Sequence, residues 1–92
     1  MIKSWRHKGL KLFYDTGSTA KIQYKHAEKL HDILQALDFA TAPKQMNFPG
    51  LDFHPLKGNL KKFYAVKVDA NWRITFMFEN KDAILVDYTD YH

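Results

Sequence analysis

The chain has 92 residues with a formal net charge of +4, and 46% of them are hydrophobic, which suits one globular domain spanning residues 1–92. It contains no cysteine, which excludes a disulfide framework and thiolate chemistry, and no run of about 18 apolar residues that could span a membrane. The N-terminus is charged where a signal peptide would become apolar, so we expect a cytoplasmic protein without membrane contact.

The positive charge is concentrated in the first third of the chain. Residues 1–30 hold seven Lys or Arg against two acidic residues, a balance of +5, whereas residues 31–60 balance at −1 and residues 61–92 at zero. Such an excess suits a polyanionic partner. A solvated helical surface would give the same pattern, so charge alone leaves both interpretations open.

The first half of the chain predicts a short strand followed by two helices. Residues 1–5 alternate weakly, as in a strand, and residues 7–15 place apolar side chains on one side of a helix that Gly17 would end. The clearest helical pattern covers residues 25–39, where one apolar stripe is formed by Ala27, Leu30, Ile33, Leu34, Leu37 and Ala40. Prolines then break the chain into an irregular connection.

The second half predicts three strands joined by short turns. With the first half, the order β-α-α-β-β-β predicts an α+β fold in which two N-terminal helices pack on an antiparallel sheet. In chain order the expected segments are a compact loop or short strand at residues 53–59, strands at 63–68, 71–78 and 83–88, a tight turn at 80–81 and a tail at 89–92.

The central strand is expected at residues 71–78, where bulky apolar residues occupy every second position. Both of its faces carry apolar side chains, so helices should cover at least one of them. Arg73 is the exception, because an unpaired buried charge costs several kcal/mol. We therefore expect Arg73 either to meet a structural carboxylate or to point into an open concavity that takes an anionic ligand. The apolar positions are Trp72, Ile74, Phe76 and Phe78.

The sequence carries no signature of a metal site or of an activated nucleophile. None of its five histidines forms a Glu-flanked pair four residues apart. His26 and His31 would lie about 140° apart around a helix and share no face, and we expect both to be surface residues. Ser4 and Ser18 have no nucleophile-elbow context, and the glycines are scattered, so we expect neither a catalytic triad nor a cofactor.

Another set of residues has the chemistry needed to cleave RNA. The 2′-OH can attack the adjacent phosphorus if a base takes its proton, cations hold the phosphate and an acid protonates the departing 5′ oxygen. By residue type alone, structural explanations are more common: a loop histidine that packs beside a proline, an arginine in a structural ion pair, and a frayed C-terminal tail. The candidates are His54, Lys57, Arg73, Asp90, Tyr91 and His92.

Separated motifs in the chain, together, resemble one family. They resemble the HigB toxins, which belong to the RelE superfamily of bacterial toxin–antitoxin systems, and the resemblance covers the whole chain in order. It implies a RelE-like single domain. The motifs are Met1-Ile2-Lys3-Ser4, His7-Lys8-Gly9-Leu10-Lys11, His54-Pro55-Leu56-Lys57-Gly58, Asn71-Trp72-Arg73-Ile74-Thr75-Phe76 and Asp90-Tyr91-His92.

The resemblance implies an endoribonuclease that cleaves mRNA in the A site of the translating 70S ribosome. It also implies a HigA-like antitoxin with a helix-turn-helix domain, through which alone the toxin would reach operator DNA. The six candidates above all match the positions that carry function in this family. A basic N-terminal surface would face ribosomal RNA, with Arg6, His7, Lys8 and Lys11 as its residues.

The sequence leaves open which of the six candidates is the general acid and which the base, and it leaves two other functions open. Nearby anions, Asp90 and the α-carboxylate of His92 itself, would favour the imidazolium form of His92 and make it the general acid. The base would then be Asp90 or His54. A gyrase poison of the same fold, or a non-catalytic RNA-binding module, would bind without cleaving. A ribosome-dependent cleavage assay separates both of these from the endoribonuclease.

Overall fold

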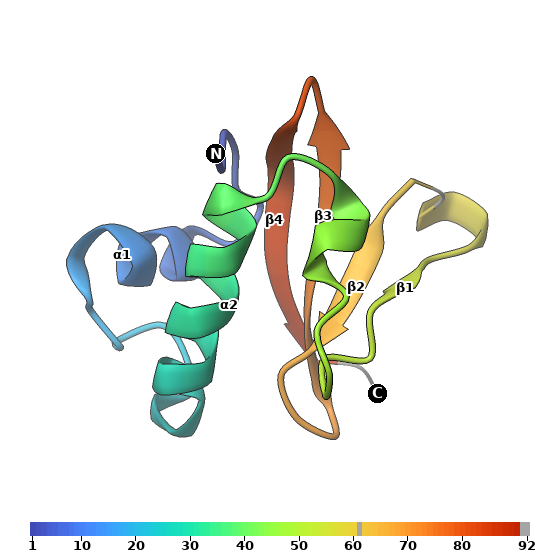
Figure 1. The fold of residues 1–92 in the computed structure, drawn as a ribbon. Coiled ribbons are helices and arrows are strands. Elements are labelled where there is room, and N and C mark those ends of the chain that lie inside the picture. Colours follow the sequence, from blue (N-terminus) through green and yellow to red (C-terminus); the bar gives the residue numbers. More distant parts are fainter. Residues whose placement is uncertain (61, 91–92) are drawn as a thin grey trace.

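The computed structural model describes residues 1–60 and 62–90, and it places the helices on one side of an antiparallel four-stranded sheet (Figure 1). The α+β prediction, with helices packed on an antiparallel sheet, is therefore confirmed. No helix within this part of the chain is long and apolar enough to cross a membrane. The α-helices are α1 (Lys8–Thr16) and α2 (Ala27–Phe39), and the strands, in their order across the sheet, are β1 (His54–Pro55), β2 (Tyr64–Lys67), β3 (Trp72–Glu79) and β4 (Asp82–Asp90).

Both helices form where the sequence predicts them. At the start of α1 the Nδ1 atom of His7 accepts a hydrogen bond from the N–H of Leu10 at 2.9 Å. The helix ends at Gly17, whose left-handed φ of 81° lets its N–H donate to the carbonyl of Phe13 at 2.7 Å. A short 3₁₀ turn, Tyr24–His26, leads into α2. The buried stripe of α2 consists of Leu30, Ile33, Leu34 and Leu37.

The central position of β3 is confirmed, because it pairs with β2 on one side and with β4 on the other. The predicted tight turn between β3 and β4 is confirmed as well. Asn80 and Lys81 both have positive φ, 52° and 73°, as a type I′ hairpin turn requires. The last strand is longer than predicted, since β4 continues through Thr89 to Asp90 and so includes part of the expected tail.

The predicted first strand is wrong. Residues 1–5 run parallel to β4 but form no continuous ladder with it; their pairing consists of two isolated bridges, Ile2 with Ala83 and Trp5 with Val86. Between these bridges Leu85 has a positive φ of 54°, and β4 holds an extra residue relative to β3. The N–H of Leu85 donates to the Oγ atom of Ser4 at 2.9 Å instead of to a main-chain carbonyl. This bulge interrupts the ladder that a continuous strand would need.

The two faces of the sheet differ in composition. Ile74 and Phe76 of β3 are fully buried in the core that includes the apolar stripe of α2. Arg73 and Thr75, which alternate with them, are only half-buried. Successive residues of a strand point to opposite faces, so the polar residues share the face that lies away from the helices.

Candidate active site

The face of the sheet away from the helices carries a strip of polar side chains that belong to different strands. Arg73 pairs across the ladder with Thr89, and Thr75 pairs with Asp87. Residues directly opposite each other on neighbouring strands project to the same face. These side chains therefore lie together although they are distant in the sequence.

A cavity of about 580 Å³ opens over this strip. Its cationic groups and its histidine come from the N-terminal segment, from β1 and the loop after it, and from β3, whereas Asp87 supplies its carboxylate. Such a mixture suits an anionic ligand that carries an aromatic ring, because the cations can bind the anion and the apolar walls can contact the ring. The residues that line the cavity are Arg6, His54, Pro55, Leu56, Lys57, Phe63, Ala65, Arg73, Thr75, Asp87 and Thr89.

His54 has a defined orientation at this cavity. It lies in β1 opposite Ala65, and its Nδ1 atom lies 2.7 Å from the carbonyl oxygen of Asp52. A carbonyl can only accept, so Nδ1 carries the hydrogen and the lone pair of the neutral ring is on Nε2. The ring is thereby held in the tautomer in which Nε2 can take a proton.

Arg73 lies at the cavity, which is one of the two outcomes the sequence left open. Its Nη1 atom donates to the main-chain carbonyl of Asp69 at 2.9 Å and to that of Trp72 at 3.3 Å. These contacts fix the guanidinium at the start of β3. Its planar set of donors is suited to binding a phosphate through two oxygens at once.

Of the four residues expected to face ribosomal RNA, only Arg6 lines the cavity. Its guanidinium carbon lies 5.2 Å from the centre of the Phe63 ring, a cation–π contact. His7 is half-buried and caps α1, while Lys11 pairs with Asp15 at 2.6 Å on the exposed side of the helix. Lys8 is exposed.

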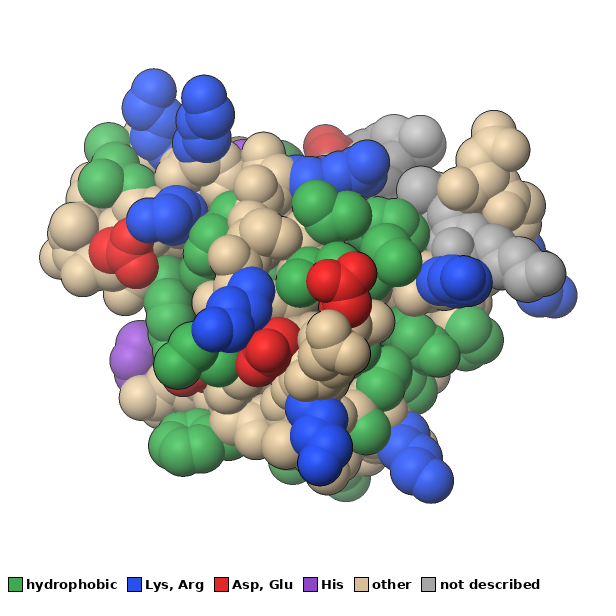
Figure 2. All heavy atoms as spheres, turned by 90° about the horizontal axis from the view of Figure 1, so that it is seen from above, with side chains coloured by type: hydrophobic (Ala, Val, Ile, Leu, Met, Phe, Trp, Pro, Cys, Tyr) green, Lys and Arg blue, Asp and Glu red, His purple; other side chains and the backbone are tan. Residues whose placement is uncertain are grey.

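On one face of the molecule (Figure 2), the positive charge is also less uniform than the concentration of lysines in the sequence predicts. On the face seen in Figure 2, Lys and Arg side chains are dispersed among acidic and hydrophobic side chains and do not form one continuous patch. At the cavity, in contrast, three cationic side chains come together: Arg6, Lys57 and Arg73.

Of the predicted catalytic residues Asp90, Tyr91 and His92, the structure describes only Asp90. Asp90 is the last residue of β4 and pairs with Trp72, so strand alternation directs it away from the face on which Thr89 lines the cavity. The predictions for Tyr91 and His92 fall on residues outside the described part of the chain. Of the six predicted catalytic residues, the structure brings His54, Lys57 and Arg73 into one cavity.

Sequence reasoning missed two features of this region. Asp87 and Thr75 line the cavity, and only the β3–β4 register could have predicted this. The expectation that His26 is a surface residue is wrong, since it is 4% exposed. The 3₁₀ turn before α2 directs the ring toward the sheet, where Nδ1 lies 2.6 Å from Tyr88 Oη and Nε2 lies 2.6 Å from Asp69 Oδ2.

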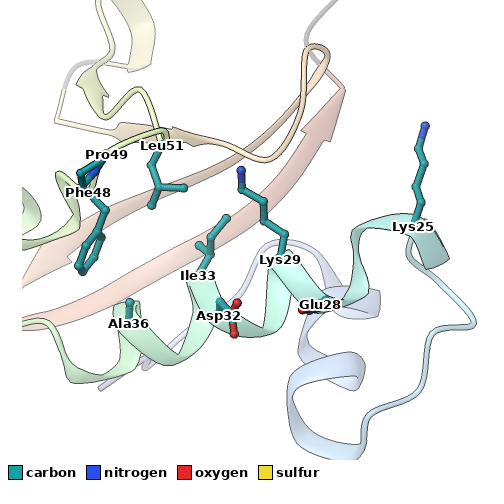
Figure 3. Close-up of a pocket in the computed structure, with 9 residues that line it drawn as sticks. All are labelled: Lys25, Glu28, Lys29, Asp32, Ile33, Ala36, Phe48, Pro49 and Leu51. Atoms are coloured by element: carbon teal, nitrogen blue, oxygen red, sulfur yellow. The ribbon is translucent and has the colours of Figure 1, made fainter.

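A second groove, of about 640 Å³, lies between α2 and the loop around residues 48–51 (Figure 3). Phe48 and Leu51 of the loop face Ile33 and Ala36 of the helix. Charged side chains of α2 and of the 3₁₀ turn before it complete the lining: Lys25, Glu28, Lys29 and Asp32. It contains no histidine or arginine, so it lacks the acid–base groups of the first cavity. Across residues 1–60 and 62–90, no group of three His, Cys, Asp or Glu could hold a metal ion.

Solved structures share this architecture. The YoeB–YefM complex from Staphylococcus aureus aligns with a TM-score of 0.65 and 14% identity, covering 100% of this chain and 98% of that one. The YoeB/ParE toxin from Agrobacterium tumefaciens aligns with a TM-score of 0.56 and 17% identity, covering 100% and 99%. The chain therefore has the same α+β fold as these two proteins.

Sequence comparison then gives the family. A family model described as the RelE-like toxin of the type II toxin–antitoxin system HigB matches residues 3–92. The Endoribonuclease HigB of Proteus vulgaris is 45% identical over 92 residues, which cover all of both chains. The protein belongs to the HigB-like family of toxins of type II toxin–antitoxin systems.

Proposed function

We propose that the protein is an endoribonuclease toxin that cleaves mRNA in the A site of the translating 70S ribosome, in the cytoplasm and without a metal ion. The relative from Proteus vulgaris is named an endoribonuclease and is similar along the whole chain. The observation that carries the proposal is the cavity in which an oriented His54 lies with Lys57 and Arg73.

The chemistry follows from the geometry of these side chains. Nε2 of His54 takes the proton of the 2′-OH, whose oxygen then attacks the adjacent phosphorus. Lys57 and Arg73 stabilise the charge that develops on the phosphate oxygens. The bond to the 5′ oxygen breaks as His92 donates a proton to it, leaving a 2′,3′-cyclic phosphate upstream. Asp90 is the weaker candidate for the base, because its strand position directs it away from this face.

The ribosome and an antitoxin complete the proposal. The cavity offers cations but few groups that could read a base, so free RNA would be poorly positioned in it, whereas the A site holds its codon in a fixed conformation. A HigA-like antitoxin with a helix-turn-helix domain would hold the toxin inactive. Operator DNA would be bound only through that antitoxin.

The test uses 70S ribosomes programmed with a defined mRNA, and primer extension to find the cut. The expected result is cleavage within the A-site codon, hardly any cleavage of the same mRNA without ribosomes, and a 2′,3′-cyclic phosphate end. His54→Ala should abolish most of the cleavage on ribosomes. His31→Ala, at an exposed position of α2, is the matched control and should cleave like the wild type. Equal cleavage of naked RNA, or ribosome binding without any cleavage, would contradict the proposal.

A further inference from the structure

The buried His26 lies where the helical layer meets the start of β3. It is 4% exposed, and its ring packs edge-on against Trp72 and Tyr88, with a centroid separation of 5.9 Å in each case. Neither the core packing of α2 nor the proposed chemistry requires a polar ring at this position. Its hydrogen bonds therefore need a separate explanation.

The donor and the acceptor of each hydrogen bond of His26 can be assigned. The pKa of Asp69 lies well below its usual range, because it accepts a hydrogen bond from His26 and others from main-chain N–H groups, so its carboxylate can only accept. Nε2 of His26 must then carry a hydrogen. In the neutral ring Nδ1 accepts from the hydroxyl of Tyr88, whose oxygen in turn accepts from the N–H of Gln23 at 3.3 Å.

Asp69 connects the buried ring of His26 to the cavity through further hydrogen bonds. Its Oδ1 atom accepts from the N–H groups of Asn71 and Trp72, at 2.9 Å each, which fixes the turn between β2 and β3. Its main-chain carbonyl accepts from Nη1 of Arg73 at 2.9 Å. One residue thus joins the buried ring of His26 to the guanidinium at the cavity.

We propose that His26 and Asp69 are positioning residues for Arg73, with the buried ring holding the turn whose carbonyl fixes the guanidinium. The inference rests on the proposed function, in which Arg73 binds the phosphate. A guanidinium that binds two oxygens depends on its orientation, and a small displacement of a group that stabilises the transition state lowers the rate. Neither positioning residue touches the substrate.

The first pair of variants separates positioning from packing. His26→Leu fills the buried space with an apolar side chain but cannot bind Asp69, whose side chain is 36% exposed and stays hydrated. We expect the melting temperature to fall, because Tyr88 and Asp69 each lose a hydrogen-bond partner, while the protein stays folded at the assay temperature. The single-turnover cleavage rate, corrected for the folded fraction, should be reduced about 10–100-fold, the range found for supporting residues around metal sites. His26→Gln keeps an N–H donor near Nε2 and should recover most of the rate. His31→Leu, on the exposed side of α2, should change neither quantity.

Asp69→Asn tests the same link from its other end. The amide oxygen can still accept from the N–H groups of the turn, but the amide nitrogen replaces the acceptor for His26. We expect the rate at saturating ribosome concentration to fall while the KM for ribosomes changes less than twofold. The ¹⁵N–¹H signal of the Arg73 Nε atom, assigned by its loss in Arg73→Ala, should shift in Asp69→Asn and His26→Leu and stay in place in His31→Leu.

Arg73→Ala, measured in parallel, separates the two levels of the proposal. If Arg73→Ala is inactive while folded His26→Leu cleaves at the wild-type rate with an unshifted Arg73 signal, the positioning inference is wrong and the proposed function stands. If Arg73→Ala cleaves as well as the wild type, the proposed role of Arg73 is wrong, and the inference that depends on it falls too. A rate loss in His26→Leu that only matches its unfolded fraction also overturns positioning.

Discussion

His54 and Arg73 line the same cavity although no hydrogen-bonded ladder joins their strands. His54 lies opposite Ala65 in β2, and Ala65 in turn lies opposite Thr75, two positions along β3 from Arg73. Ala65 has the smallest side chain of these four residues and is 2% exposed. The surface of the sheet is therefore recessed between the imidazole of His54 and the guanidinium of Arg73. The imidazole and the guanidinium thus border the same cavity across a small residue.

His54→Gln should reduce cleavage on programmed ribosomes about 10²–10⁴-fold, because it removes the group that takes the 2′-OH proton. The free energy of unfolding should change little, since the half-buried ring makes its hydrogen bond to the carbonyl of a loop residue, Asp52. Urea unfolding and single-turnover cleavage measure the two quantities separately. A variant that remains folded and cleaves at the wild-type rate would exclude His54 as the base.

Arg73→Ala should cost about 2–4 kcal/mol of transition-state stabilisation, seen as a loss of cleavage rate with ribosome binding largely kept. Arg73→Lys should recover only part of the rate, because an ammonium group does not bind two phosphate oxygens in the planar geometry of a guanidinium. If Arg73→Ala instead mainly unfolds the protein in urea titrations, the residue is structural.

Arg6→Ala should weaken binding to the ribosome, and the affinity should become less dependent on salt, since one cation–phosphate contact is lost. Lys8→Ala is the matched control, because Lys8 is exposed on α1 and does not line the cavity. Its effect should be smaller. Binding isotherms at several salt concentrations make the comparison, and equal effects of the two variants would favour a diffuse basic surface over the cavity.

Acid should destabilise the wild type more than Asp69→Asn. The carboxyl of Asp69 has a folded-state pKa well below its usual range, with the hydrogen bond from His26 as the largest cause. Such a group stabilises the fold above its unfolded pKa of about 3.9, and this contribution is lost as the pH falls toward the folded-state value. The difference in unfolding free energy between the two proteins should therefore shrink below about pH 4. Urea titrations across this range would show parallel curves if Asp69 did not contribute.

His92→Ala should slow cleavage about 10²–10⁴-fold if His92 protonates the 5′ leaving oxygen. A substrate with a 5′-thio leaving group needs no proton there, so the variant should cleave it nearly as fast as the wild type does. The wild type with both substrates provides the reference. Failure of the thio substrate to restore the rate in His92→Ala would assign the acid to another group.

Local pattern in the sequence determined the regular elements of this protein. The alternation at residues 72–78 predicts β3, the stripe at residues 27–40 predicts α2, and Gly17 and Asn80 mark a helix end and a hairpin turn. Each of these depends on backbone geometry and burial over a few neighbouring residues, which the sequence records directly. The separated motifs also indicated the HigB family, and they contain His54, Lys57 and Arg73, which the structure brings into one cavity.

Only the tertiary structure decided which distant residues share a surface. The bulge at Leu85 replaces the predicted first strand with isolated bridges, and the β3–β4 register brings Asp87 into the cavity. His26 reads as a surface helical residue until the 3₁₀ turn before α2 and the turn at Asp69 meet around it. Burial and hydrogen-bond partners of this kind arise from the packing of separate segments, and no local period in the chain encodes them.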